Sequence, residues 1–259
     1  MKEYIQISKD FINSTFVPNL AHTIRTSPDT VQLFGGALHG CAAKVIEQEK
    51  NIPISSLSTT FLNSSDSLSP ISVTVTPLVE KKSLSIYNVF LEQEGNLLSV
   101  SQAICSPNPV PADQSKFRIL VPKKFPEPHN WLWDTKNESI FNYLKAQISL
   151  NEGIVNWLDG YKTDISAICT LSDFGSIILV QFLSQIPRTI TIHSQFFNSF
   201  DSDKLFSEFE ILGFSPGSVS VRFDQYDLNG NPICFSRLTS SLRPMHPDSV
   251  NRFNETYKP

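Results

Sequence analysis

Length, composition and charge exclude several classes of protein. The 259 residues carry a net charge of −4 and no block of basic side chains, which argues against nucleic acid as a partner. Hydrophobic residues make up 40% of the chain and charged residues 18%, a balance that argues against disorder. No stretch of about 18 apolar residues occurs, so the sequence predicts no membrane span.

The four cysteines, at positions 41, 105, 169 and 234, indicate no metal or redox chemistry. They form no Cys-x-x-Cys pair and no His cluster has metal-ligand spacing, so no cofactor is expected. Cys41, Cys169 and Cys234 have mostly apolar or small neighbours, as buried free thiols in a reducing compartment do. The chain begins without a signal-peptide core and ends at Pro259 without a Ser-Lys-Leu signal, so we expect an intracellular, cytoplasmic protein.

Residues 30–49 have the apolar spacing of a helix, flanked by Pro28 and Pro53. Apolar side chains recur every three or four positions: Val31, Phe34, Leu38, Cys41, Ala42 and Val45. Gly35, Gly36 and Gly40 each lower helix propensity by about 1 kcal/mol. Small residues at that cost predict close contact with a sheet or a ligand.

A run of strands follows this helix. Residues 71–77, 84–90 and 98–104 have strand-like composition, and residues 94–96 form a hairpin turn signal between the last two. Residues 106–133 contain six prolines and are the best linker candidate, although residues 117–121 suit a short edge strand.

The second half has the same order of elements. Residues 177–183 are predicted as a shorter helix that begins near Asp173 and stops at Pro187. Strands are predicted at 189–193, 205–211, 218–223 and 233–238, with a hairpin turn at 228–230.

The two halves are related by an internal repeat. A shift of 135 residues places Phe61 on Phe196 and Gly95 on Gly230, while the helices align with Phe34-Gly35 on Phe174-Gly175. A central helix followed by an antiparallel sheet, occurring twice, is the outline of a double hotdog. We therefore predict an α+β fold with two antiparallel sheets, each wrapped around a central helix. The expected units are residues 1–125, with the start of the linker, and 126–259.

One catalytic motif in the sequence is misleading. Residues 213–217 match the Gly-x-Ser-x-Gly nucleophile elbow, which needs a helix after the serine and an N–H on the next residue. Pro216 has no N–H, and a strand is predicted to follow. We interpret this segment as a hairpin loop and reject a serine hydrolase.

Asp173 and Thr189 are the candidate catalytic residues. An aspartate at the start of a helix is commonly an N-cap, but beside free N–H groups it can also take a proton from an attacking water. Thr189 taken alone is more simply explained as a β-branched residue at a strand edge. His39 and His193 have no nearby acid and are expected to be packed residues with satisfied hydrogen bonds.

Several segments resemble the acyl-CoA thioesterases of the TesB-like, double-hotdog type. The segment 33–36 resembles the Phe-Gly-Gly of that family's first helix, and 172–174 resembles the segment with its catalytic Asp. The segments 189–196 and 230–244 resemble its Thr-containing strand and its last strand with a closing Arg. The match is diffuse and runs from about residue 31 to residue 244, so the order of the segments carries it.

The resemblance implies a site in which an Asp, a Thr and a Gln hold the attacking water. Asp173 and Thr189 match the first two, but Leu238 stands where the family has Gln, five residues before Arg243. Gln102, on the corresponding strand of the first half, is an alternative. The substrate-binding set that we expect comprises Phe34, Gly35, Gly36, Phe174, Gly175 and Leu238.

The implied activity is hydrolysis of an acyl-CoA thioester, with acyl-CoA as the partner and no cofactor. The change at Leu238 instead favours an acyl-CoA-binding protein without turnover. A hotdog hydratase fits less well, because those enzymes have His five residues after the Asp and this chain has Ile178. Exposed hotdog edges often pair, which leaves a homodimer open.

Overall fold

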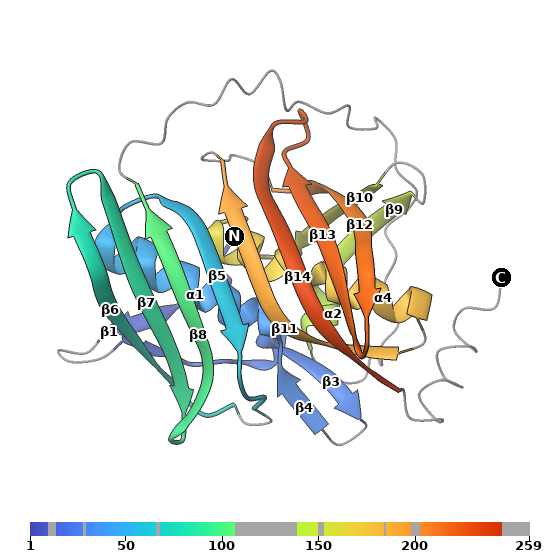
Figure 1. The fold of residues 1–259 in the computed structure, drawn as a ribbon, viewed down its shortest axis with the longest axis horizontal. Helices are drawn as coiled ribbons and strands as arrows, with labels where there is room; N and C mark the ends of the chain where they lie inside the picture. Colours follow the sequence, from blue (N-terminus) through green and yellow to red (C-terminus); the bar gives the residue numbers. More distant parts are fainter. Residues whose placement is uncertain are drawn as a thin grey trace.

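The computed structural model describes residues 1–9, 14–27, 30–65, 68–106, 139–149, 153–183, 185–197 and 203–244. Twelve antiparallel strands form one continuous sheet in the order β1-β2-β6-β7-β8-β5-β11-β14-β13-β12-β10-β9 (Figure 1). The first six in this order come from the first half of the chain: β1 (Ile7–Lys9), β2 (Ser14–Phe16), β5 (Ile54–Phe61), β6 (Ile71–Lys81), β7 (Leu84–Gln93) and β8 (Asn96–Cys105). The others come from the second half: β9 (Leu144–Ser149), β10 (Gly153–Leu158), β11 (Gln185–Phe196), β12 (Leu205–Ser215), β13 (Ser218–Tyr226) and β14 (Pro232–Pro244).

The two halves of the sheet meet at β5 and β11. These strands pair antiparallel, with Ser58 opposite His193, and the strand order on one side mirrors the order on the other. The two sheets expected from the sequence are therefore joined edge to edge into one. The proposed boundary near residue 125 lies outside the described residues, as do the linker from residue 107 onwards and its candidate strand.

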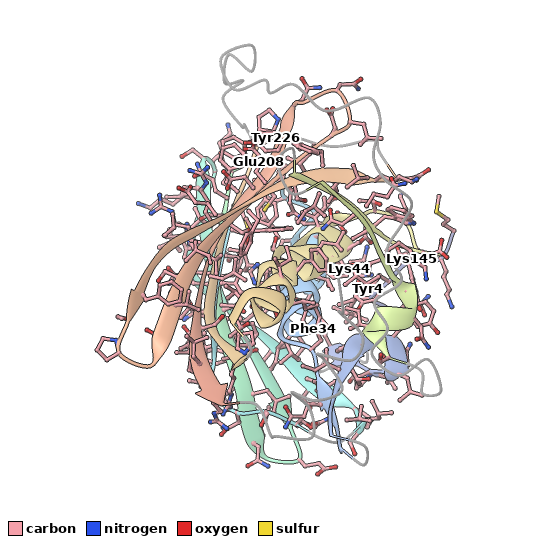
Figure 2. All side chains as sticks on the ribbon, turned by 90° about the vertical axis from the view of Figure 1, so that its right-hand side faces the viewer. Tyr4, Phe34, Lys44, Lys145, Glu208 and Tyr226 are labelled. Carbon is pink, nitrogen blue, oxygen red and sulfur yellow. The ribbon has the colours of Figure 1, made fainter. Side chains whose placement is uncertain are left out.

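The helices lie together on one side of this sheet (Figures 1 and 2). They are α1 (Gly35–Lys50), α2 (Ile140–Tyr143), α3 (Ile165–Ser172) and α4 (Phe174–Leu183), with a 3-10 turn at Leu20–His22. Helices α1 and α3 cross antiparallel and very close together. A Cβ on Gly36 would lie 2.4 Å from the Thr170 carbonyl oxygen, and one on Gly40 would lie 2.5 Å from that of Ser166. Gly36 and Gly40 are therefore required by another helix, where we had expected a sheet or a ligand.

The prediction that the first helix starts at residue 30 is wrong. Residues Thr30–Leu33 form strand β4, which pairs with β3 (Thr23–Ser27) in a separate two-stranded sheet, and α1 begins at Gly35. Backbone bonds from Leu33 N–H to the Ser65 carbonyl and from Phe34 N–H to that of His22 hold this segment extended. The β-branched pair at 30 and 31 favours that conformation.

The second helix was predicted too short. α4 begins at Phe174, and α3 precedes it from Ile165, where the Asp164 side chain caps the helix by accepting from the Ala167 N–H at 3.1 Å. The predicted strands at 71–77, 84–90, 98–104, 189–193, 205–211, 218–223 and 233–238 all lie inside observed strands. The central strand β5, the strand β3 and the short strands β1, β2, β9 and β10 near the sheet edges were not predicted.

Irregularities in the sheet follow the internal repeat. The pairing of β5 with β8 shifts register between Ile54 and Ser56, and the pairing of β11 with β14 shifts between Thr189 and Thr191, 135 residues later. Bulges are defined features of a fold, so a repeat that includes them relates the two backbones and not only their composition.

The helices repeat with a different offset from the one predicted. The close contacts Gly36–Thr170 and Gly40–Ser166 exchange with one another under a shift of 130 residues. That offset places Gly35 on Ile165, the first residues of α1 and α3, so the alignment of Phe34-Gly35 with Phe174-Gly175 was wrong. The alignment was wrong because no sequence signal indicated α3, whose residues Ile165–Ser172 are mostly apolar and include no glycine.

A continuous hydrophobic core fills the space between helices and sheet and includes residues of both halves. The four cysteines are all buried and free, as predicted for Cys41, Cys169 and Cys234. In the described part of the chain, no helix is both long and apolar enough to cross a membrane.

Candidate active site

Asp173 lies at the junction of α3 and α4, with only 2% of its surface exposed. Its Oδ2 accepts a hydrogen bond from the Gly36 N–H at 2.9 Å. Its Oδ1 accepts from Thr189 Oγ1 and from Ser176 Oγ, both at 2.7 Å. The structure thus brings three predicted residues together, Asp173, Thr189 and Gly36, and adds Ser176, which sequence reasoning missed.

The N-cap interpretation of Asp173 is replaced by another arrangement. Asp173 is the C-cap residue of α3, and its N–H bonds to the Thr170 carbonyl at 3.2 Å. Its carboxylate points to the N-terminus of α1, a helix from the other half of the chain. The N-cap residue of that helix, Phe34, provides no side-chain cap, so the Gly36 N–H is available to the carboxylate.

Burial raises the pKa of Asp173 to about 6, while the hydrogen bonds from Thr189, Ser176 and Gly36 act to lower it. Burial disfavours the charged carboxylate and is the larger effect here. A carboxylate with a pKa just below neutrality is mostly ionised at pH 7 and still binds a proton well. This balance suits a general base.

Glycine at positions 35 and 36 lets α1 approach the carboxylate. A Cβ on Gly35 would lie 2.9 Å from Asp173 Oδ2 and 3.5 Å from the ring of Phe61. A Cβ on Gly36 would also lie 2.6 Å from the ring of Phe34. Any larger residue at either position would therefore displace the acid from the helix N-terminus.

Thr189 sits at the bulge of β11, where its partner on β14 is Ser240. Ser240 Oγ lies 3.4 Å from Ser176 Oγ, and Ser176 Oγ lies 2.7 Å from Thr189 Oγ1. Ser176 could have been found from the sequence, because a residue three positions after an aspartate lies beside it on a helix. Ser240 had no such signal, since the bulge sets its register.

The remaining predicted residues lie deeper in the core. Leu238, 1% exposed, stands two residues from Ser240 on β14, opposite Ile192 and Val221. Phe174 packs edge-on against Phe223, with ring centroids 6.1 Å apart.

In the described part of the chain, two further candidates form no hydrogen bond to the Asp173 carboxylate, and their surroundings differ from those of Gly36 and Thr189. A Cβ added to Gly175 would meet Phe209 and Phe223 at 3.7 Å, an ordinary contact, so its glycine is not required by space. Gln102 is exposed on β8, opposite Ser58 and Asn88, whereas Asp173 is buried on the helix side of the sheet. It therefore does not substitute for a Gln at Leu238.

The two histidines differ from one another. His39 is fully buried, its ring nitrogens contact Thr59 Oγ1 at 2.7 Å and Ser194 Oγ at 3.0 Å, and burial lowers its pKa to about 3. It is a packed, neutral residue, as predicted. His193 is exposed on β11, so the expectation that it is packed was wrong.

The Gly-x-Ser-x-Gly segment is the hairpin loop between β12 and β13. Ser215 ends β12, Ser218 begins β13, and their hydroxyl groups lie 2.6 Å apart at the surface. Gly217 has a φ of +74°, which the tight turn requires. The rejection of a serine nucleophile agrees with this geometry, because no helix follows Ser215.

The helix pair has a second end, related to the Asp173 site by the repeat. The offsets of 130 for helices and 135 for strands place Asp173 on Ala43, Ser176 on Ile46, Thr189 on Ile54 and Ser240 on Cys105. Ile54 and Cys105 are paired across β5 and β8, as Thr189 and Ser240 are across β11 and β14. All four residues of this second set are buried and none is charged.

Fold comparisons define the class as a double-hotdog protein. A candidate thioesterase from Novosphingobium aromaticivorans has a TM-score of 0.81 at 15% identity and covers 92% of this chain and 98% of its own. A hot dog fold protein of unknown function from Alicyclobacillus acidocaldarius has a TM-score of 0.77 at 13% identity, covering 92% and 96%. The acyl-CoA thioesterase II TesB2 of Mycobacterium marinum has a TM-score of 0.66 at 14% identity, covering 93% and 98%. The predicted α+β double hotdog is confirmed.

A family model matches part of the first half of the chain and narrows the resemblance from a fold to a protein family. Residues 25–106 match the family model of the acyl-CoA thioesterase N-terminal domain. No curated protein matches the sequence. The chain resembles the TesB-like, double-hotdog acyl-CoA thioesterases, as the sequence motifs indicated.

Proposed function

We propose that this protein is an acyl-CoA thioesterase that hydrolyses its substrate with a water activated by Asp173. The observation that carries this proposal is the buried carboxylate, held between the Thr189 hydroxyl at 2.7 Å and the Gly36 N–H at 2.9 Å. An acid, a hydroxyl group and an uncapped helix N-terminus are the groups that attack on a thioester needs.

The reaction balances with these groups and needs no cofactor. Water donates a proton to Asp173 as its oxygen attacks the carbonyl carbon, and Thr189 orients the water. The positive end of the α1 dipole, at Gly35, stabilises the oxyanion that forms on the carbonyl oxygen, while the Gly36 N–H holds Asp173. When the carbon–sulfur bond breaks, the CoA thiolate takes the proton from Asp173, leaving CoA and a carboxylic acid that ionises.

Acyl-CoA hydrolysis tests this proposal directly. Thioester cleavage is measured with a panel of acyl-CoAs of different chain length, for the wild type and for Asp173→Asn. Asp224→Asn is the matched control, because burial also raises the pKa of Asp224 to about 6 and its carboxylate bonds to Arg222 at 3.1 Å, outside the proposed site. We expect turnover by the wild type and by Asp224→Asn, and almost none by Asp173→Asn.

A second candidate function is acyl-CoA binding without turnover. The apolar, buried Leu238, where the resemblance implies a Gln, favours it. Saturable acyl-CoA binding by a wild type that cleaves none of the panel would support this second function. Turnover that survives Asp173→Asn would instead mean that the base lies elsewhere.

A further inference from the structure

Ser176 occupies a central position in the Asp173 site. It lies one helical turn after Asp173 on α4 and is 5% exposed. Its Oγ is 2.7 Å from Asp173 Oδ1 and 2.7 Å from Thr189 Oγ1, so the three oxygens form a triangle, since Thr189 also contacts Oδ1 at 2.7 Å.

The hydrogen atoms available to this triangle limit what it can do. Two hydroxyl groups supply two hydrogens for three contacts, so at most two of the contacts are hydrogen bonds at one time while the carboxylate is ionised. In this structure Thr189 and Ser176 both donate to Oδ1, which leaves no hydrogen for the contact between the two hydroxyl groups. When a water enters, the Thr189 hydroxyl can turn to donate to it, because Ser176 still donates to Oδ1.

Ser240, on strand β14, contacts the Ser176 hydroxyl group. Its Oγ lies 3.4 Å from Ser176 Oγ, and the bulge in β11 places it opposite Thr189. Ser240 is fully buried, so its hydroxyl group does not exchange this contact for bulk water. The two serines therefore supply hydrogen-bonding groups where Leu238 supplies none.

We propose that Ser176 is a positioning residue, which holds Oδ1 of Asp173 and thereby frees the Thr189 hydroxyl to orient the attacking water, with Ser240 supporting it. This inference rests on the proposed thioesterase function and names the residues that replace the expected Gln.

The electrostatics of Asp173 agree with this role. Burial raises the pKa of Asp173, and the hydrogen bonds from Thr189, Ser176 and Gly36 lower it. In the part of the chain that the structure describes, no charged side chain contributes to this shift. Removing the Ser176 hydroxyl should therefore raise the pKa of Asp173 further.

The test compares Ser176→Ala with Ser236→Ala. Ser236 is a matched control, because it is fully buried on β14 and its hydroxyl contacts Ser194 at 2.9 Å and Ser172 at 3.0 Å, outside the triangle. The Asp173 carboxyl is titrated by 13C NMR, with its signal assigned from Asp173→Asn. The pH dependence of kcat is measured with an acyl-CoA that the wild type cleaves.

We expect Ser176→Ala to raise the titration midpoint by about one pH unit, the effect of one hydrogen bond to a charged group. Its kcat at pH 7 should fall about 2-fold through the smaller ionised fraction of Asp173, and about 10-fold in total because Thr189 then orients the water less well, with the pH profile displaced in the same direction. Ser176→Cys, which keeps a weaker donor, should lie between Ser176→Ala and the wild type. Ser240→Ala should change both quantities in the same direction, but less.

An unchanged midpoint in both Ser176→Ala and Ser240→Ala, or an equal shift in Ser236→Ala, would overturn the proposal. A wild type that cleaves no acyl-CoA would overturn the proposed function and the role of Thr189 towards water. The NMR midpoint would then still decide whether Ser176 holds Asp173.

Discussion

The two ends of the helix pair have the same backbone and opposite chemistry. At one end, the N-terminus of α1 begins without a side-chain cap, and the Gly36 N–H bonds to a carboxylate from the other half of the chain. At the other end, the N-terminus of α3 is capped by its own Asp164, whose Oδ1 accepts from the Ala167 N–H and whose Oδ2 pairs with Lys44 at 3.1 Å. We call the first the open end, because its helix N-terminus has no side-chain cap of its own. We call the second the closed end, because its own Asp164 caps the helix and forms a salt bridge.

The side chains around each end differ accordingly. Asp173, Ser176, Thr189 and Ser240 surround the open end, and apolar residues or a cysteine stand at the corresponding places of the closed end: Ala43, Ile46, Ile54 and Cys105. A repeat therefore duplicates geometry without duplicating function, because catalysis depends on polar side chains that the backbone does not specify. We expect one site in each chain.

The largest expected effect on turnover comes from replacing the residue at the open end with the residue that stands at the corresponding position of the closed end. Asp173→Ala introduces the residue found at position 43 and removes the proposed general base. The turnover of acyl-CoA should fall about 10²- to 10⁴-fold, as measured by steady-state kinetics on a cleaved substrate. A fall in turnover of less than about 10-fold would mean that the Asp173 carboxylate does not set the chemistry of the open end apart from that of the closed end.

Breaking the salt bridge should affect stability and leave the chemistry unchanged. Burial lowers the pKa of Lys44, but Asp164 and Glu47 together raise it by more, so the pKa lies above its ordinary value and the side chain is charged. Lys44→Met leaves the Asp164 carboxylate buried without its partner, which should cost about 3 kcal/mol of unfolding free energy. Chemical denaturation measures this loss, while kcat should stay within about 2-fold. A large fall in kcat would show that the two ends are coupled.

Glycine substitutions should separate the close helix contact from an ordinary one. Gly36→Ala places a Cβ 2.4 Å from the Thr170 carbonyl oxygen. It should lower the free energy of unfolding by about 1–3 kcal/mol and should also lower the activity. Gly175→Ala is the control, because its nearest contacts are at 3.7 Å and alanine favours a helix. Thermal unfolding of both variants tests the difference, which equal losses would contradict.

The smallest effect concerns pH. Burial raises the pKa of Asp173 to about 6, and only its ionised form accepts a proton, so kcat/KM should rise with pH and level off above about 7. At pH 5 the ionised fraction, and with it the rate, should be about 10-fold lower.

Protonation of Asp173 also links folding to pH. Because the folded state binds this proton more tightly than the unfolded state, Asp173 makes stability fall as pH rises from about 4 to about 6. Asp173→Asn should remove that contribution, which denaturation curves at several pH values measure. A pH-independent difference between the variant and the wild type would contradict the raised pKa.

Much of the fold could be predicted because local patterns carry it. Residues 71–77 alternate apolar and polar side chains, and the hairpin turns at Gly95 and Gly230 set the repeat, since few residues other than glycine adopt a positive φ. The order of their segments predicted that Asp173 and Thr189 act together, and the structure places their side-chain oxygens 2.7 Å apart. Those features are local in the sequence, and the structure retains them.

The rest depends on contacts between distant segments. No local pattern shows that α1 and α3 cross at Gly36 and Gly40, or that a bulge in β11 turns Ser240 towards Thr189. The sequence by itself determined the repeat of the two meanders, seven of the strands and Asp173 as the candidate acid. Only the tertiary structure decided which helix N-terminus faces that acid, because the N–H of Gly36 and the carboxylate of Asp173 come from different halves of the chain.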